Sequence, residues 1–274
     1  MIQESKLFKV IRAIFLIFSS LFVIIPLIPL VFMAFKTGVE YSSTSVFTAP
    51  ESWTNFYNFA YAIKVGKLGP ALINTAVILV ISLTIQILLT AMVSYVLHRF
   101  EFRGKKLIRG MFTMTMFIPV VTTQVIVFQI IYKLGLVNKI WSVILLYCGV
   151  GIIAIYIMLN LLDTISKDLD ESALIDGANY FTIFRKIILP LLKPACTTVL
   201  ILNGIGLYND FYVPNLYLNG KVKTFTIALY QFFGATSTPF EVVAAAILIG
   251  IIPIAIVYIF LQKYIFYGLG GAVK

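Results

Sequence analysis

The sequence predicts an all-α, polytopic membrane protein with six transmembrane helices. Of its 274 residues, 61% are apolar and 12% are charged, which leaves too little polar surface for a water-soluble domain. The apolar residues gather in six long runs, and the basic residues concentrate in every second connection between them. The same apolar excess excludes an intrinsically disordered chain.

Each predicted span is an apolar run of about 20 residues or more, the length that a helix needs to cross the hydrocarbon core. A helix is required there because no water satisfies backbone groups left outside an internal ladder. The runs are residues 13–35, 71–97, 111–132, 140–162, 195–218 and 242–262. The first run is too long for a signal peptide and lacks a small-residue cleavage site before Lys36, so a retained helix is expected.

Prolines and one carboxylate interrupt these runs. The prolines, which should bend or break helices locally, are Pro26, Pro29, Pro119 and Pro253. Only the fifth run contains a charged residue, Asp210. Ionisable residues within spans mark proton and ion relays, so their near absence argues against a proton-coupled secondary carrier.

The distribution of basic residues predicts the orientation of the chain. The connections on the side of the termini hold Lys6, Lys9, Arg12, Arg99, Arg103, Lys105, Lys106, Arg109, Lys167, Arg185, Lys186, Lys193, Lys263 and Lys274. The opposite side holds Lys36, Lys64, Lys67, Lys133, Lys139, Lys221 and Lys223. This two-to-one bias places both termini and the 163–194 connection in the cytoplasm and the 36–70 connection outside. The formal charge of +10 therefore reflects topology rather than a nucleic-acid surface, and residues 1–274 are expected to form one transmembrane domain.

Motifs for covalent chemistry are missing from the sequence. The Gly-Lys pairs lack the upstream Gly and the Ser or Thr of a phosphate-binding loop, so the chain is not expected to hydrolyse ATP or to act as an enzyme. The single His98 has no Cys or His at ligand spacing and is expected to be a solvated residue rather than a metal ligand. Cys148 and Cys196 are too few for a disulfide scaffold. We expect no cofactor or metal on this chain.

The cytoplasmic stretch 168–194 predicts two short helices joined by a tight turn. Asp168 and Glu171 have the spacing of a capping box at the start of the first helix. Gly177 follows the last residue of that helix, where a left-handed backbone is needed. The second helix is expected to start near Asn179 and to end where Pro190 blocks its continuation.

The first of these helices is expected to display Ala173, Leu174, Ile175 and Ala178 toward a partner protein, since a helix in water has little reason to expose such residues. The alternative is that the helix pair lies flat on the protein's own cytoplasmic face as an amphipathic element.

The residues of this stretch resemble the EAA loop of the permease subunits of binding-protein-dependent ABC importers. The match consists of Glu171, Ala173, Asp176, Gly177, Ala178, Phe184, Ile187, Leu189, Pro190 and Pro194, with Ser172 in place of the second Ala. The resemblance implies that the first helix is a coupling helix, which inserts into a cleft of a separate ATPase subunit. Its implied contact residues are Glu171, Ser172, Ala173, Asp176, Gly177 and Ala178.

Further segments are similar to the carbohydrate-uptake branch of that family, of the maltose-permease type. They are residues 94–106, 117–145 and 207–234, and the ending 270–274, which resembles the tail of the smaller maltose-type subunit. The resemblance implies a type I ABC importer permease fold in a bacterial-type cell membrane, with two ATPase subunits that carry ATP and Mg²⁺. It also implies a sister permease, an extracytoplasmic sugar-binding protein and an oligosaccharide cargo.

The fifth run is the most polar and predicts a lining for a transport path. Its polar residues are Asn203, Tyr208, Asn209 and Asp210. Polar groups at membrane depth face protein or a water-filled cavity, and aromatic rings with amides and carboxylates suit a sugar. The alternative is that the chain has left the membrane at Tyr208 and that Asp210 is a solvated loop acid.

Aromatic residues of the external 42–67 segment, such as Trp53, Phe56 and Tyr57, fit a membrane interface and also a docking contact. Two other functions stay open: a half-length secondary carrier, which would need charges in its spans, and a non-transporting membrane scaffold, which would need no polar path.

Overall fold

The computed structural model describes residues 6–218, 220, 222–234 and 238–270, which form helices and connecting turns with no strand among them. The ending at residues 271–274, and Lys221 with its expected external position, lie outside the described residues. The described part of the chain confirms the all-α prediction.

The helices provide three to six candidate membrane spans. Three are long and apolar enough alone: Leu7–Phe35, Leu68–Arg99 and Phe240–Gln262. Three more arise if each bent helix pair is one span: Lys105–Thr115 with Val120–Lys133, bent by 103°, Ile140–Tyr147 with Ile152–Leu162, bent by 42°, and Tyr180–Leu191 with Lys193–Asn209, bent by 68°. If each bent pair is one span, the expected six crossings correspond to these three pairs and the three longer elements, the first of which is interrupted at Pro26.

The chain divides into two compact units, the first comprising residues 1–69 and 228–253. Its elements are α1 (Lys6–Ile24), α2 (Leu27–Phe35), α3 (Gly38–Ser43), α4 (Tyr57–Val65), most of α15 (Phe225–Phe233) and the first part of α16 (Phe240–Gly270). Ala34 of α2 packs with Ala244 and Ala245 of α16. These small residues let the two helix backbones approach closely, as in other membrane helix contacts.

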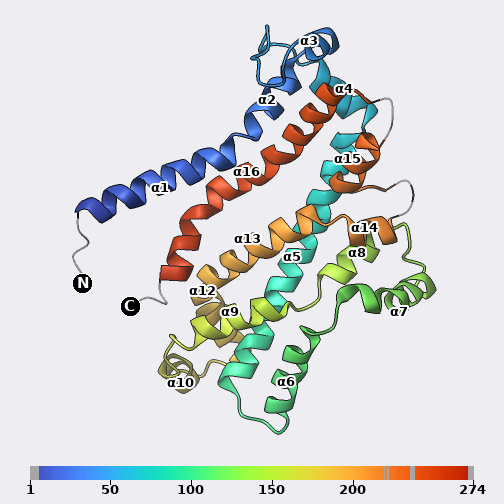
Figure 1. The fold of residues 1–274 in the computed structure, drawn as a ribbon. Coiled ribbons are helices and arrows are strands. Elements are labelled where there is room, and N and C mark those ends of the chain that lie inside the picture. Colours follow the sequence, from blue (N-terminus) through green and yellow to red (C-terminus); the bar gives the residue numbers. More distant parts are fainter. Residues whose placement is uncertain (1–5, 219, 221, 235–237, 271–274) are drawn as a thin grey trace. The chain divides into compact units, whose positions relative to one another are not determined.

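The second unit comprises residues 70–227 and 254–274. It contains α5 (Leu68–Arg99) from residue 70 on, α6 (Lys105–Thr115), α7 (Val120–Lys133), α8 (Ile140–Tyr147), α9 (Ile152–Leu162), α10 (Asp168–Ile175), α11 (Tyr180–Ile183), α12 (Leu189–Leu191), α13 (Lys193–Asn209) and α14 (Tyr212–Tyr217). A π-helical turn, Phe184–Ile188, joins α11 to α12. In this unit α5, α9 and α13 share one core (Figure 1), whose members include Ala91, Met158 and Val199.

Two expectations about the spans are wrong. The fifth run is not one helix: α13 ends at Asn209, Asp210 is extended, and α14 follows as a separate short helix. Pro253 does not break α16, which continues through it. The breaks expected at Pro26 and Pro119 are confirmed, since each proline is the N-cap of a new helix, where its missing N–H leaves no bond unmade.

Candidate functional site

The short helix α10 begins differently from the expected capping box. Its N-cap is Lys167, which makes no side-chain cap, and Asp168 is already the first helical residue. The backbone N–H of Asp168 instead donates to Ser166 Oγ over 3.2 Å. The expected capping box is wrong because the helix starts one residue too early for Asp168 to be its N-cap. The acidic residues of the first turn still lie at the positive end of the helix dipole, where negative charge is favourable.

The end of α10 confirms the expected tight turn. Gly177 has φ +84°. The N–H of Gly177 donates to the carbonyl of Leu174, and that of Ala178 donates to the carbonyl of Ala173, which is the paired pattern of a Schellman motif. The next helix starts at Asn179, whose side chain accepts from the N–H of Thr182 over 2.8 Å.

The second helix ends at Leu191, one residue after Pro190, close to where it is expected to end. It passes through the π-helical turn Phe184–Ile188 and α12, and the chain then bends at Leu192 into α13. In the π turn the N–H of Leu189 reaches the carbonyl of Phe184, five residues earlier. A proline one residue later is accommodated because Pro190 lies in the first turn of α12, where its missing N–H breaks no ladder.

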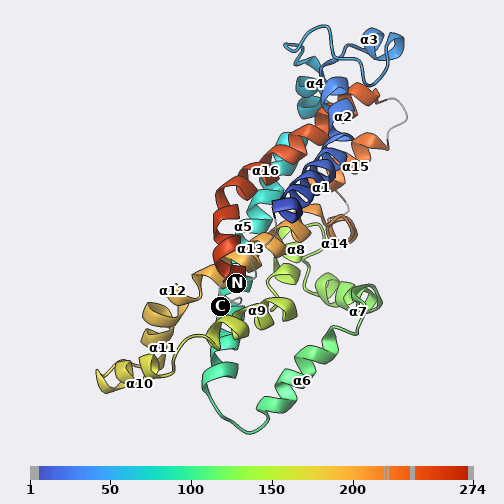
Figure 2. The same ribbon diagram turned by 60° about the vertical axis from the view of Figure 1, so that its left-hand side comes forward.

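The surface of α10 is mixed rather than uniformly small and apolar. Figure 2 shows α10 at the tip of the segment that α11 and α12 extend from α13. Ala173 is 9% exposed and Ala178 is half-buried, and both pack into the core of the second unit. The expectation that these two alanines are displayed is therefore wrong. The exposed residues of α10 and the turn after it include Asp168, Leu169, Glu171, Ser172, Leu174, Ile175, Asp176 and Gly177.

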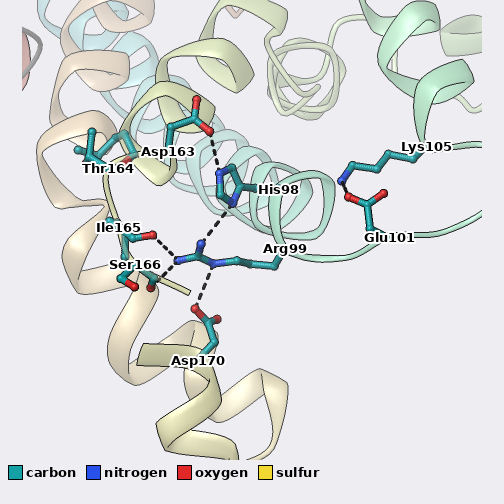
Figure 3. A network of polar contacts seen from close by, with 10 residues as sticks. His98, Arg99, Glu101, Lys105, Asp163, Thr164, Ile165, Ser166 and Asp170 are labelled. Atoms are coloured by element: carbon teal, nitrogen blue, oxygen red, sulfur yellow. Dashed lines mark hydrogen bonds and ion pairs between the residues drawn. The ribbon is translucent and has the colours of Figure 1, made fainter. Parts of the chain in front are cut away.

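A buried ion pair fixes α10 to the end of α5 (Figure 3). Arg99 Nε lies 3.0 Å from Asp170 Oδ2, with the two side chains 5% and 10% exposed. Neither atom has a hydrogen bond of standard geometry, so this charge contact compensates their burial. Tyr95 donates to Asp170 Oδ1 over 2.7 Å, and Arg99 Nη2 donates to the carbonyl of Ile165. One arginine thus holds both the helix and the turn that precedes it.

The same end of α5 carries a second charged contact. His98 Nε2 lies 2.8 Å from Asp163 Oδ1, and the imidazole side chain is only 13% exposed. The expectation of a solvated histidine is therefore wrong, because Asp163 at the end of α9 faces it. Nearby, Lys105 donates to exposed Glu101 over 2.7 Å, and this bond holds the pKa of Glu101 below its usual value.

Polar side chains repeat every fourth residue along α5 and face α8 and α9. They are Ser82, Gln86, Thr90 and Ser94, all buried. At the break between α8 and α9, Gln86 Nε2 donates to the carbonyl of Gly149 over 2.9 Å, while Gln86 Oε1 accepts from Asn203 Nδ2 of α13 over 2.8 Å. A broken membrane helix leaves carbonyls that need partners, and this amide bridge supplies one.

Asp210 is held by three elements rather than free in a loop. Its Oδ2 accepts from the Tyr147 hydroxyl over 2.7 Å, and its Oδ1 accepts from the N–H of Val213 over 3.2 Å. Its backbone carbonyl accepts from Thr226 Oγ1 over 2.9 Å. The structure therefore contradicts the solvated-loop alternative and makes Asp210 an anchor where α13 ends.

The other expected path residues differ in their surroundings. Tyr208 is 9% exposed and stacks on Phe225 with ring centroids 6.0 Å apart. Asn209 is exposed, and its Nδ2 donates to the carbonyl of Ile205 in its own helix. Asn203 joins Gln86 some distance along α13, so the four residues do not converge on one point.

Sequence reasoning missed Tyr95, Arg99 and Gln86. A signal was present: a buried polar stripe with a spacing of four residues is unusual in an apolar span and marks the face that packs against protein. The partner of Arg99, by contrast, lies 71 positions along the chain, a pairing that no local pattern shows.

These features define a polytopic membrane protein in which side-chain amides bridge the break between α8 and α9, and in which an ion pair fixes a short helix pair to the end of a long membrane helix. A family model described as "Binding-protein-dependent transport system inner membrane component" matches residues 87–268. The chain belongs to this family, the permease subunits of ABC importers. The EAA loop with its coupling helix is typical of the family, and residues 168–194 carry it.

Similar proteins cover almost the whole chain. The melibiose/raffinose/stachyose import permease protein MelC of Bacillus subtilis is 33% identical, over 91% of each chain. The multiple sugar-binding transport system permease protein MsmG of Streptococcus mutans is 32% identical, over 99% of each. In fold, a chain from the crystal structure of a bacterial ABC transporter for import of the acidic polysaccharide alginate matches with a TM-score of 0.83 at 23% identity, covering 96% of this chain and 99% of that one.

Proposed function

We propose that this permease subunit imports a carbohydrate, in particular an oligosaccharide, delivered by an extracytoplasmic binding protein. The observation that supports the cargo is the similarity along nearly the full chain to permeases named for melibiose, raffinose and stachyose and for multiple sugars. The chain itself performs no covalent chemistry in this proposal. ATP and Mg²⁺ belong to two separate ATPase subunits, and a sister permease completes the path.

The coupling contact is the exposed face of α10. Glu171, Ser172, Asp176 and Gly177 are accessible to an ATPase cleft, with Leu174 and Ile175 supplying the apolar part of the surface. Ala173 and Ala178 belong to the same motif but act from inside, by letting α10 pack closely on the core. Because the Arg99–Asp170 pair joins α10 to α5, a displacement of α10 is transmitted to a span as a rigid-body movement.

The transport path follows α13. Asn203 and Asn209 offer amides along this helix, while Tyr208 and Asp210 hold its external end in place through the contacts with Phe225 and Tyr147. An aromatic and amide lining suits hydroxyl-rich cargo.

The basic-residue bias supports a multi-pass protein of a bacterial-type cell membrane with both termini and the 163–194 connection in the cytoplasm. A single cysteine placed at Lys167, which is exposed, should resist impermeant thiol reagents in intact cells, whereas one at Lys221 should react. The opposite labelling pattern would invert the topology and remove the coupling role.

Reconstitution tests the whole proposal. The permease, its sister and the ATPases are placed in proteoliposomes with the binding protein and radiolabelled melibiose, raffinose or stachyose. ATP-dependent uptake that needs the binding protein and withstands a proton uncoupler is expected. Uptake abolished by the uncoupler would favour a secondary carrier, and sugar-independent ATP hydrolysis without uptake would favour a scaffold.

A further inference from the structure

A polar cavity in the first unit is lined by two acceptor groups, each on a buried residue, to which no described residue donates a hydrogen bond. The cavity has a volume of about 420 Å³ and lies between α3, α4 and the start of α16. Its lining residues include Asn58, Glu241, Tyr57 and Tyr61. None of its lining residues belongs to the coupling loop or to α13.

Glu241 is the charged group of this cavity. Its residue is only 6% exposed, yet no hydrogen bond or ion pair joins its carboxylate to any residue that the structure describes. Its place in the first turn of α16 gives some compensation from the helix dipole. A neighbouring buried acid, Glu40, shows the usual solution, because its two carboxylate oxygens accept from the N–H groups of Thr37 and Glu51.

Asn58 presents the second acceptor. Its residue is 2% exposed, and both N–H bonds of its amide are used, donating to the carbonyls of Ala34 over 3.0 Å and Lys36 over 2.7 Å. These two bonds fix the orientation of the amide, so Asn58 Oδ1 is the atom that can accept a hydrogen bond from a group in the cavity. No described residue donates to it. The Glu241 carboxylate and Asn58 Oδ1 are therefore two acceptors, one of them charged, that can take a hydrogen bond from a ligand.

The tyrosines at the cavity indicate that the donor carries a positive charge. The rings of Tyr57 and Tyr61 lie 6.0 Å apart at the cavity, and aromatic rings attract cations. A buried carboxylate is stable when a positive charge pairs with it, which a neutral sugar hydroxyl does not supply. The complement of this cavity is thus an ammonium or a guanidinium group.

We propose that this cavity receives a lysine or arginine side chain of the extracytoplasmic binding protein when that protein docks. The proposal rests on the proposed function, because the basic-residue bias places the 36–70 connection and the start of α16 on the external side, where the binding protein approaches. A basic residue seated there loses its water and is paired with Glu241, as in a buried interface hot spot.

The test uses the complete transporter in nanodiscs, with binding protein titrated against ATP hydrolysis. Glu241→Gln keeps the shape and removes the charge, and should raise the binding-protein concentration for half-maximal stimulation at least tenfold while basal hydrolysis is unchanged. Glu51→Gln, an exposed acid of the same unit, is the matched control and should change nothing. Raising the salt concentration should shrink the difference between wild type and Glu241→Gln.

Tyr57 keeps the proposal testable if Glu241→Gln folds poorly, because this ring is 67% exposed and tolerates replacement. Tyr57→Ala should weaken docking, and Tyr57→Phe should restore it. Equal titrations for Glu241→Gln and Glu51→Gln would overturn the inference, as would an effect on sugar dependence with docking unchanged, which would make the cavity a sugar site. Wild-type complex that no binding protein stimulates would instead refute the proposed function itself.

Discussion

Replacing Asp170 with Asn should loosen α10 without disturbing the spans. The change keeps an acceptor for Tyr95 but leaves Arg99, whose side chain is 5% exposed, without its counter-charge. Breaking a buried pair by removing one partner costs about 3–5 kcal/mol. Each 1.4 kcal/mol is a factor of about ten, so about 3 kcal/mol corresponds to a roughly hundredfold larger population of undocked α10.

Hydrogen–deuterium exchange of the α10 amides in nanodiscs measures this population, since protection reports local opening. The matched control is Asp168→Asn, which removes the same charge from the same helix at an exposed position. Asp170→Asn should speed exchange in α10 while leaving α5 protected, and uptake should fall more than ATP hydrolysis. Equal exchange in the two variants would show that the ion pair does not hold α10. It would also contradict the proposal that α10 and α5 move as one rigid body.

Three further substitutions test other parts of the site. Gly177→Val should destabilise the local fold by about 1–2 kcal/mol through backbone strain alone, because φ is +84° and an added Cβ meets no atom within 4 Å. Faster limited proteolysis of the 168–190 stretch measures this loss. Gly177→Asn should have a smaller effect, because Asn adopts a positive φ more easily. Glu171→Ala should leave thermal stability unchanged, since this exposed residue caps nothing, but should weaken co-purification of the ATPase; a lower melting temperature would contradict this. Asp210→Ala should destabilise the protein by about 1–3 kcal/mol, because it leaves the Tyr147 hydroxyl unpaired. It should also lower sugar uptake while ATPase binding stays intact. Unchanged uptake would show that Asp210 plays no part in the transport path.

Local features of this protein could be predicted from its sequence. Gly177 and Asn179 were placed correctly because a left-handed turn and an N-cap depend on a few neighbouring residues. The apolar runs predicted membrane helices for the same reason. Pro119 correctly marked a break, although nothing local revealed that the bend there reaches 103°.

Features that depend on residues far apart in the sequence could not be predicted. The sequence left open whether Asp210 is a path residue or a solvated acid, because Tyr147, its partner, lies 63 positions away. His98 was expected to be solvated because Asp163 could not be foreseen beside it. The π turn before Pro190 was not expected, because it depends on how this segment packs in the core. Pairings over such separations follow from tertiary packing and leave no mark on the local pattern.

The wide turn Phe184–Ile188 sets the angular phase between the α10–α11 segment and α13. An α-helix advances about 100° per residue, and a π turn behaves as one residue inserted into that advance. Deleting one residue from this turn would therefore restore a regular α-helix and swing everything before it by about 100° relative to α13. Ile183 and Phe184, now in the core, would turn outward, and the exposed face of α10 would point to a different neighbour. In the proposed coupling, this single extra residue sets the direction in which a displacement of α10 reaches α13.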